Sequence, residues 1–127
     1  MPEFEPEMDV LQGLSYLDAV VRESLRVNAP VSNTVRTAAE DDVIPLSEPI
    51  IGRDGNKLNE ITVAKGDTVF VGILNMNRAP EIWGEDAAEF KPERWIDGTI
   101  PETATKGIEA PWAHIATFLA GPRGALP

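Results

Sequence analysis

The sequence contains no cysteine and only one histidine, His114. Disulfides, thiolate metal sites and cysteine nucleophiles are therefore excluded for this chain, as is a multi-histidine metal site. No run of about 18 apolar residues is present, so no segment is expected to span a membrane. The start, MPEFEPEMDV, lacks the basic residues and apolar stretch of a signal peptide. Either the protein is soluble, or a targeting segment belongs to a part of the protein outside this sequence.

Basic residues are also scarce. The chain has 11 Lys and Arg against 21 Asp and Glu, which gives a net charge of -10. Such a chain repels phosphate backbones and anionic lipid, so nucleic-acid partners and polybasic membrane binding are not expected. What is present, 127 residues of which 43% are apolar, has the size and composition of one globular domain.

One helix is predicted from about Gly13 to Asn28, in the text GLSYLDAVVRESLRVN. Its apolar residues recur every three or four positions and so share one face of an amphipathic helix. They are Leu14, Leu17, Val21 and Leu25. The helix is expected to end before Pro30, because the residue that precedes a proline is pushed out of helical geometry.

Short extended segments follow. SNTVRTA and EPIIG have β character, and Asp54-Gly55 predicts a turn between extended segments. In ITVAKGDTVFVGI, apolar residues alternate with others on both sides of Lys65-Gly66-Asp67, which predicts a β-hairpin over residues 61–73. A small sheet with a hairpin is therefore expected.

The rest of the chain has few signs of regular structure. Residues 75–94 contain several breakers, with a single helical turn expected near Ala79–Ile82, and residues 96–116 are expected to form loop. So long an irregular stretch is uncommon in a self-contained domain. The fold class is therefore α+β, and the chain is not expected to be a complete domain.

Three charged residues could form a network. Glu23 and Arg26, in ESLR, share a helix face. As an exposed pair they would contribute a few tenths of a kcal/mol; buried with a third partner, the pair would matter far more. Arg94, in FKPERW, is the candidate partner, because its planar guanidinium can bridge a carboxylate and backbone carbonyls.

Other candidates are weaker. Arg36 lies in a β-type segment, and Arg123 is flanked by Gly121 and Gly124. Either arginine could face solvent or contact an anion. His114 is interpreted as an ordinary polar residue near the surface. The tryptophans are interpreted as packing residues; they are Trp83, Trp95 and Trp112. No catalytic triad, phosphate loop or carboxylate cluster with metal spacing is found.

Taken in order, the motifs resemble the C-terminal part of a cytochrome P450. ESLR at 23–26 is similar to the ExxR helix of that family, and APVSNTVRTAAEDDVIPL at 29–46 to the strand segment after it. The text from residue 61 to Trp95, which ends in PERW, resembles the hairpin and the entrance of the meander. FLAGPRGALP at 118–127 is similar to the start of the haem-binding signature FxxGxRxCxG.

The resemblance implies roles for several residues. Glu23, Arg26 and Arg94 would form the structural Glu-Arg-Arg network of the family. The residues implied to contact haem are Arg36 and Arg123 at the propionates and Phe118 and Gly121 in the loop beneath the porphyrin. The cysteine that ligates iron is expected at position 125, where Ala125 stands, so no metal ligand is assigned.

The resemblance therefore implies a fragment of a haem-thiolate monooxygenase, which uses O2, a reductase and a small organic substrate. Without the cysteine and the oxygen-activating helix, this chain alone is expected to be inactive. A non-catalytic fragment that docks to a partner protein is the alternative. Residues 1–10 are expected to form a flexible lead, and residues 11–127 a C-terminal cytochrome P450 fragment truncated at the haem-binding loop. Members of the family are often anchored in the endoplasmic reticulum membrane, but this sequence shows no anchor and leaves the location open.

Overall fold

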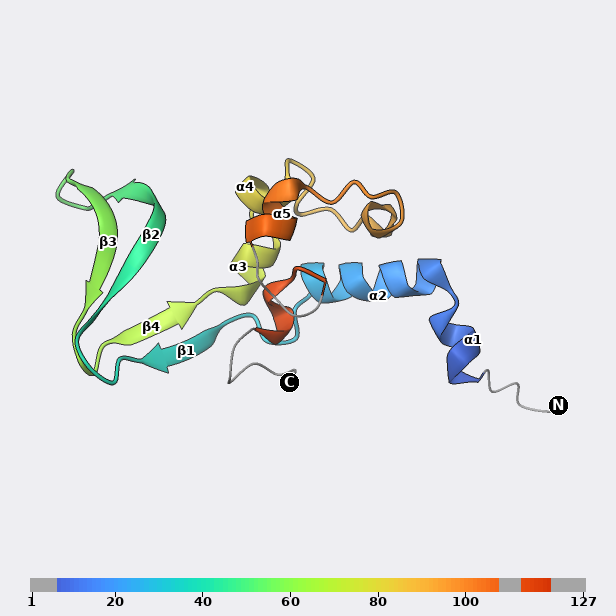
Figure 1. Cartoon of the computed structure of the whole chain (residues 1–127), viewed down its shortest axis with the longest axis horizontal. Coiled ribbons are helices and arrows are strands. Elements are labelled where there is room, and N and C mark those ends of the chain that lie inside the picture. Colours follow the sequence, from blue (N-terminus) through green and yellow to red (C-terminus); the bar gives the residue numbers. More distant parts are fainter. Residues whose placement is uncertain (1–6, 108–112, 120–127) are drawn as a thin grey trace. The chain divides into compact units, whose positions relative to one another are not determined.

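The computed structural model describes residues 7–107 and 113–119. The chain divides into two compact units, one formed by Met1–Asn33 with Gly72–Pro127 and the other by Thr34–Val71. The first contains the helices and the second contains the strands, all labelled in Figure 1. Mixed helices and small antiparallel sheets confirm the predicted α+β class.

Helix α2 spans Ser15–Val27, as the apolar spacing predicted, and follows the short helix α1 at Met8–Gln12. Helix α1 includes residues on both sides of the boundary predicted between residues 10 and 11. The division into a flexible lead at 1–10 and a cytochrome P450 fragment at 11–127 stays a prediction. The buried face of α2 shares only Leu25 with the predicted apolar face. Ala19, Glu23 and Arg26 are buried, whereas Leu17 and Val21 are 41% and 43% exposed. The side of α2 that packs in this unit therefore carries a charged pair.

The remaining elements of the first unit are short. They are α3 at Ile73–Asn77, α4 at Pro80–Trp83, the 3-10 turn η1 at Pro92–Trp95, α5 at Glu102–Gly107 and the 3-10 turn η2 at Ala116–Phe118. The turn predicted near Ala79–Ile82 is confirmed as α4. The loop predicted over 96–116 is wrong at α5, because Pro101 stands just before this helix, where a proline does not interrupt the hydrogen-bond ladder.

A small apolar cluster holds these elements together. Trp83, Ala87, Ala104 and Ile115 are its buried members, and Leu25 of α2 packs against them. Ala104, on α5, is 0% exposed. The pairing of α5 with α4 in this cluster explains why α5 forms despite its weak sequence signal: burial against a tertiary partner stabilises a helix that is too short to be stable alone.

The second unit consists of two antiparallel pairs of strands. Strand β2 (Asp42–Ile51) pairs with β3 (Lys57–Val63) across the Asp54-Gly55 turn, which confirms that turn. Gly55 there has a φ of +80°, a conformation that glycine adopts without strain.

The hairpin predicted over residues 61–73 is wrong. Strand β4 (Thr68–Val71) does not pair with β3; it pairs with β1 (Thr34–Thr37), with Val35 opposite Phe70. Strands β3 and β4 do flank the Lys65-Gly66-Asp67 turn, but they do not pair with each other. Strand β3 pairs with β2, and β4 pairs with β1. Alternation along a strand predicts its exposed and buried faces, and it carries no information about which strand lies alongside.

Candidate functional site

A buried ion pair lies at the centre of the helical unit. Helix α2 places Glu23 and Arg26 three residues apart on one face, and both side chains are 0% exposed. The Nε and Nη2 atoms of Arg26 donate to Oε2 and Oε1 of Glu23 at 2.9 and 2.7 Å. Two parallel hydrogen bonds of this kind fix orientation as well as distance. The pair is thus buried, and the alternative of an exposed pair is wrong.

The remaining donors of Arg26 hold backbone carbonyls. Its Nη1 donates to the carbonyl oxygens of Asn77 and Ala87 at 2.7 and 2.6 Å, and its Nη2 donates to that of Glu89 at 2.9 Å. Residues 84–91 lie in no helix or strand whose N–H groups could donate to the carbonyls of Ala87 and Glu89. One buried guanidinium therefore satisfies carbonyls that would otherwise be costly to bury, and it ties α2 to α3 and to the irregular segment.

Arg94 approaches the same carboxylate from η1. Its Nε donates to Oε1 of Glu23 at 3.1 Å, and its other nitrogens donate to Oδ1 and the carbonyl of Asp86 at 3.4 and 3.3 Å. The Arg94 side chain is 2% exposed. The structure thus brings together Glu23, Arg26 and Arg94, which lie 71 residues apart at the extremes. We call these three residues the Glu-Arg-Arg network.

Two contacts to Glu23 were not predicted. The backbone N–H of Lys91 donates to Oε1 at 2.9 Å, and the indole Nε1 of Trp95 donates to Oε2 at 2.9 Å. Trp95 is therefore a hydrogen-bond donor as well as a packing residue. The only sequence signal for this role is its position directly after Arg94 in PERW, since a backbone donor such as that of Lys91 leaves no mark in the sequence.

Aromatic rings cover the network on one side. The guanidinium carbon of Arg26 lies 4.9 Å from the centroid of the Trp83 ring. Trp83 and Trp95 have ring centroids 5.8 Å apart and planes tilted by 55°. A desolvated arginine over an indole face gains a cation–π attraction of about 2 kcal/mol. The apolar cluster and the charged network are therefore joined through Trp83.

The net effect of these contacts keeps Glu23 ionised. Burial by itself would raise the pKa of Glu23, but hydrogen bonds from Arg26, Lys91 and Trp95, with the charge of Arg26, outweigh burial and hold the pKa below its ordinary value of 4.5. Five donated hydrogen bonds reach its two oxygens. A carboxylate so surrounded is a structural anchor, since none of its lone pairs is left to take up a proton from a substrate.

Acid is therefore expected to weaken the fold through Glu23. Because the folded carboxyl has a lower pKa than the unfolded one, its stabilising effect is complete above pH 4.5 and is lost as the pH falls through the lowered pKa. Urea unfolding of the chain and of Glu23→Gln, followed from neutral pH downward, measures this. The gap in unfolding free energy between the two should narrow in acid; a gap that stays constant would contradict the prediction.

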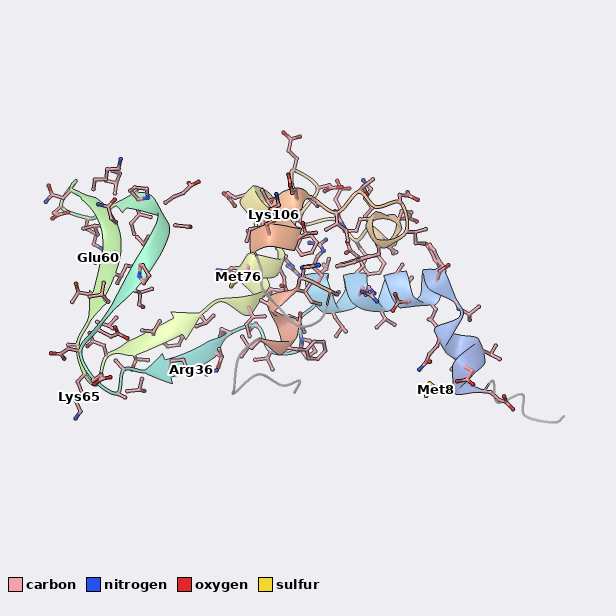
Figure 2. All side chains as sticks on the ribbon, viewed as in Figure 1. Met8, Arg36, Glu60, Lys65, Met76 and Lys106 are labelled. Carbon is pink, nitrogen blue, oxygen red and sulfur yellow. The ribbon has the colours of Figure 1, made fainter. Side chains whose placement is uncertain are left out.

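The residues predicted to contact haem are only partly described. Arg36 is on β1 (Figure 2), where its exposed side chain donates from Nη1 to Thr34 Oγ1 and the Val35 carbonyl at 2.8 and 3.0 Å. Phe118 is the last residue of η2 and is half-buried. Arg36 belongs to the unit of strands and Phe118 to the unit of helices. Gly121, Arg123 and Ala125 lie outside the described residues, so the haem contacts stay predictions.

The donor set does not suit thiolate-bound haem. Cysteine is absent from the whole sequence, and residues 7–107 and 113–119 contain no group of three His, Cys, Asp or Glu side chains placed to hold a metal ion. His114, the single imidazole, is half-buried and has a left-handed φ of 52°. The chain therefore has no residue that could act as the thiolate ligand of haem iron. Within the same residues, no helix is both long and apolar enough to cross a bilayer.

The chain is similar in sequence to known proteins of one family. The family description "Cytochrome P450" matches residues 2–124. Cytochrome P450 monooxygenase 91 of Postia placenta is 54% identical over 93% of the chain, and cytochrome P450 monooxygenase 205 of the same fungus is 48% identical over 99%. Cytochrome P450 monooxygenase claO of Ampulloclitocybe clavipes is 46% identical over 90%. The chain spans only 22%, 23% and 21% of the length of these relatives.

One solved structure shares the fold. The retinoic acid-bound cyanobacterial CYP120A1 superposes with a TM-score of 0.63 over 96% of the chain and 24% of that protein, at 24% sequence identity. At that identity the likeness concerns the fold alone. It supports a fold of short helices and small antiparallel sheets for this chain.

Proposed function

Because this chain belongs to the cytochrome P450 family, we propose that it is a segment of a haem-thiolate monooxygenase and does not activate oxygen by itself. The single observation that carries the proposed inactivity is the lack of cysteine, with Ala125 at the position of the family ligand. In this family the thiolate donates electron density to haem iron and favours O–O cleavage. An alanine methyl group has no atom that could replace it.

For a complete member of the family that keeps the cysteine ligand, we infer the monooxygenase activity that the relatives carry in their names. Such a protein would insert one oxygen atom from O2 into a small organic substrate, with electrons from a reductase. In that setting the Glu-Arg-Arg network would have a purely structural role. Its carboxylate is saturated with hydrogen bonds and its guanidinium groups are buried, so these side chains stabilise the segment and take no part in chemistry.

Spectroscopy of the chain with added haem tests the proposal. The purified chain would be mixed with haem, reduced and exposed to carbon monoxide. We expect no Soret band at the position typical of thiolate ligation. Such a band from the unchanged chain would contradict the proposed inactivity. The matched variant is Ala125→Cys, and a thiolate band that appears only in this variant would assign the loss to position 125.

A second candidate function is non-catalytic docking to a protein of the same family. The observation that favours it is the exposed apolar side of α1 and α2, where Leu17 and Val21 face solvent beside Leu11. Exposed apolar surface of this kind marks either an interaction site or a tendency to aggregate. Sedimentation of the chain with a full-length relative distinguishes the two: a complex of fixed stoichiometry supports docking, and self-association without such a complex contradicts it.

A further inference from the structure

The turn η2 is enclosed by unusual backbone conformations. Ala113, His114 and Leu119 all have positive φ, at 54°, 52° and 59°, and none is glycine. These conformations are disfavoured for residues with a Cβ atom and persist only where surrounding contacts impose them. Contacts with other segments must therefore hold Ala116–Phe118 in place. This turn leads directly into the segment that resembles the haem-binding loop.

A single side chain of α3 makes two of these contacts. Asn77 is 0% exposed. Its Oδ1 accepts from the backbone N–H of Ala116 at 2.8 Å, and its Nδ2 donates to Thr117 Oγ1 at 2.8 Å. Thr117 Oγ1 in turn donates to the carbonyl of Leu25, on α2, at 2.7 Å. The backbone carbonyl of Asn77 is itself held by Arg26 at 2.7 Å.

The chemistry of the partners determines which side chain can stand here. The N–H of Ala116 requires an acceptor. The hydroxyl of Thr117 has given its only proton to Leu25, so it can only accept and requires a donor. An amide supplies both groups from one short side chain. An ionised carboxylate of the same shape would satisfy Ala116 but would face the lone pairs of Thr117.

We propose that Asn77 is a positioning residue that joins the Glu-Arg-Arg network to η2 and so fixes the position of Ala116–Phe118 within the helical unit. Through its backbone it is held by Arg26, and through its amide it holds two successive residues of the turn. If η2 moved, Ala113, His114 and Leu119 would no longer be held in their positive-φ conformations. The proposal concerns hydrogen bonds within this chain and does not depend on haem binding.

Amide hydrogen exchange of the full chain tests this directly. In Asn77→Asp at neutral pH, the amides of Ala116 and Leu119 should exchange roughly tenfold faster, as the loss of one buried hydrogen bond implies. Amides of the β2–β3 pair should keep their wild-type rates. Asn75→Asp is the matched control, since Asn75 is on the same helix but exposed, and it should change neither set. Equal acceleration of all amides in Asn77→Asp would overturn the proposal.

The pH dependence of Asn77→Asp adds a measurement that packing alone would not affect. When protonated, the introduced carboxyl has one donor and one acceptor, as the amide has. Exchange at Ala116, compared with the unchanged chain at each pH, should therefore return toward wild type as the pH falls. The charged group in contact with this residue is Arg26, whose guanidinium binds its backbone carbonyl; Thr117 and Ala116 contribute no charge. A defect independent of pH would count against the proposal.

Thr117 provides an independent route if Asn77→Asp does not fold. Thr117→Ser keeps the hydroxyl and should leave exchange at Ala116 and Leu119 near wild type. Thr117→Val removes the hydroxyl at nearly constant volume and leaves the amide of Asn77 without its acceptor, so the same two amides should exchange roughly tenfold faster. If Ser and Val give equal rates, the link from Asn77 to Thr117 does not position η2.

Discussion

Replacing Glu23 by alanine is expected to lower the free energy of unfolding by about 3–5 kcal/mol, the loss typical when one partner of a buried ion pair is removed. The variant leaves Arg26 and Arg94 buried without a carboxylate between them, and it also leaves the indole of Trp95 without an acceptor. A small domain has about 5–15 kcal/mol of stability in total. The expected loss is therefore a large fraction of the total stability, and circular dichroism with urea titration should show a much lower unfolding midpoint for Glu23→Ala.

The matched control is on the same helix. Asp18 accepts from Arg22 at 2.6 Å, and the two side chains are 51% and 33% exposed. Exposed pairs contribute only about 0.3–0.5 kcal/mol at this spacing. Asp18→Ala should therefore leave the unfolding transition almost unchanged. If both variants lost the same small amount of stability, Glu23 would have no special role and the network would not organise this unit.

Replacing Trp83 by alanine should have an effect of similar size for a different reason. Trp83 is 0% exposed, belongs to the buried cluster and lies beneath the guanidinium of Arg26. Truncation of a buried tryptophan typically costs about 3–5 kcal/mol through lost burial and the cavity left behind. Here it also removes the cation–π contact. Denaturant unfolding monitored by far-ultraviolet circular dichroism would measure the loss.

Two variants show whether the effect comes from the ring. Among the described residues, the Nε1 atom of Trp83 has no hydrogen-bond partner. Trp83→Phe removes this unsatisfied donor and keeps an aromatic face, so it should be much milder than alanine. Phe70, on β4, is 70% exposed, and Phe70→Ala should change stability by no more than about 0.5 kcal/mol. A loss in Phe70→Ala equal to that in Trp83→Ala would contradict the assigned core.

Together these variants distinguish two contributions to the stability of the irregular segment: hydrogen bonds from buried side chains, and apolar packing. Residues 84–95 have one 3-10 turn and no longer helix. Their backbone is instead held by side chains: Arg26 binds the carbonyls of Ala87 and Glu89, and Glu23 binds the N–H of Lys91. The apolar contact through Trp83 excludes water from these bonds, and hydrogen bonds in such surroundings are stronger than in solvent.

The elements with strong local signals could be predicted from the sequence. Helix α2 was predicted from apolar spacing and a following proline, and the Asp54-Gly55 turn from residues that tolerate its geometry. The third partner of the Glu23–Arg26 pair was inferred from an arginine in an irregular segment. Helix α5 is not predictable in this way, because a proline in its neighbourhood predicts a break. The pairing of β4 with β1 is not predictable either, because strands that follow each other in the sequence need not pair with each other.

The family can be inferred from four motifs in order, and the absence of a thiolate follows from the absence of cysteine at every position. The burial of Glu23 and Arg26 on α2, and the link from Arg26 through Asn77 to η2, become visible only in the folded chain. One cause explains both. Helical spacing fixes which residues share a face, but burial and hydrogen bonding depend on segments that lie dozens of residues away, and these meet only when the chain has folded.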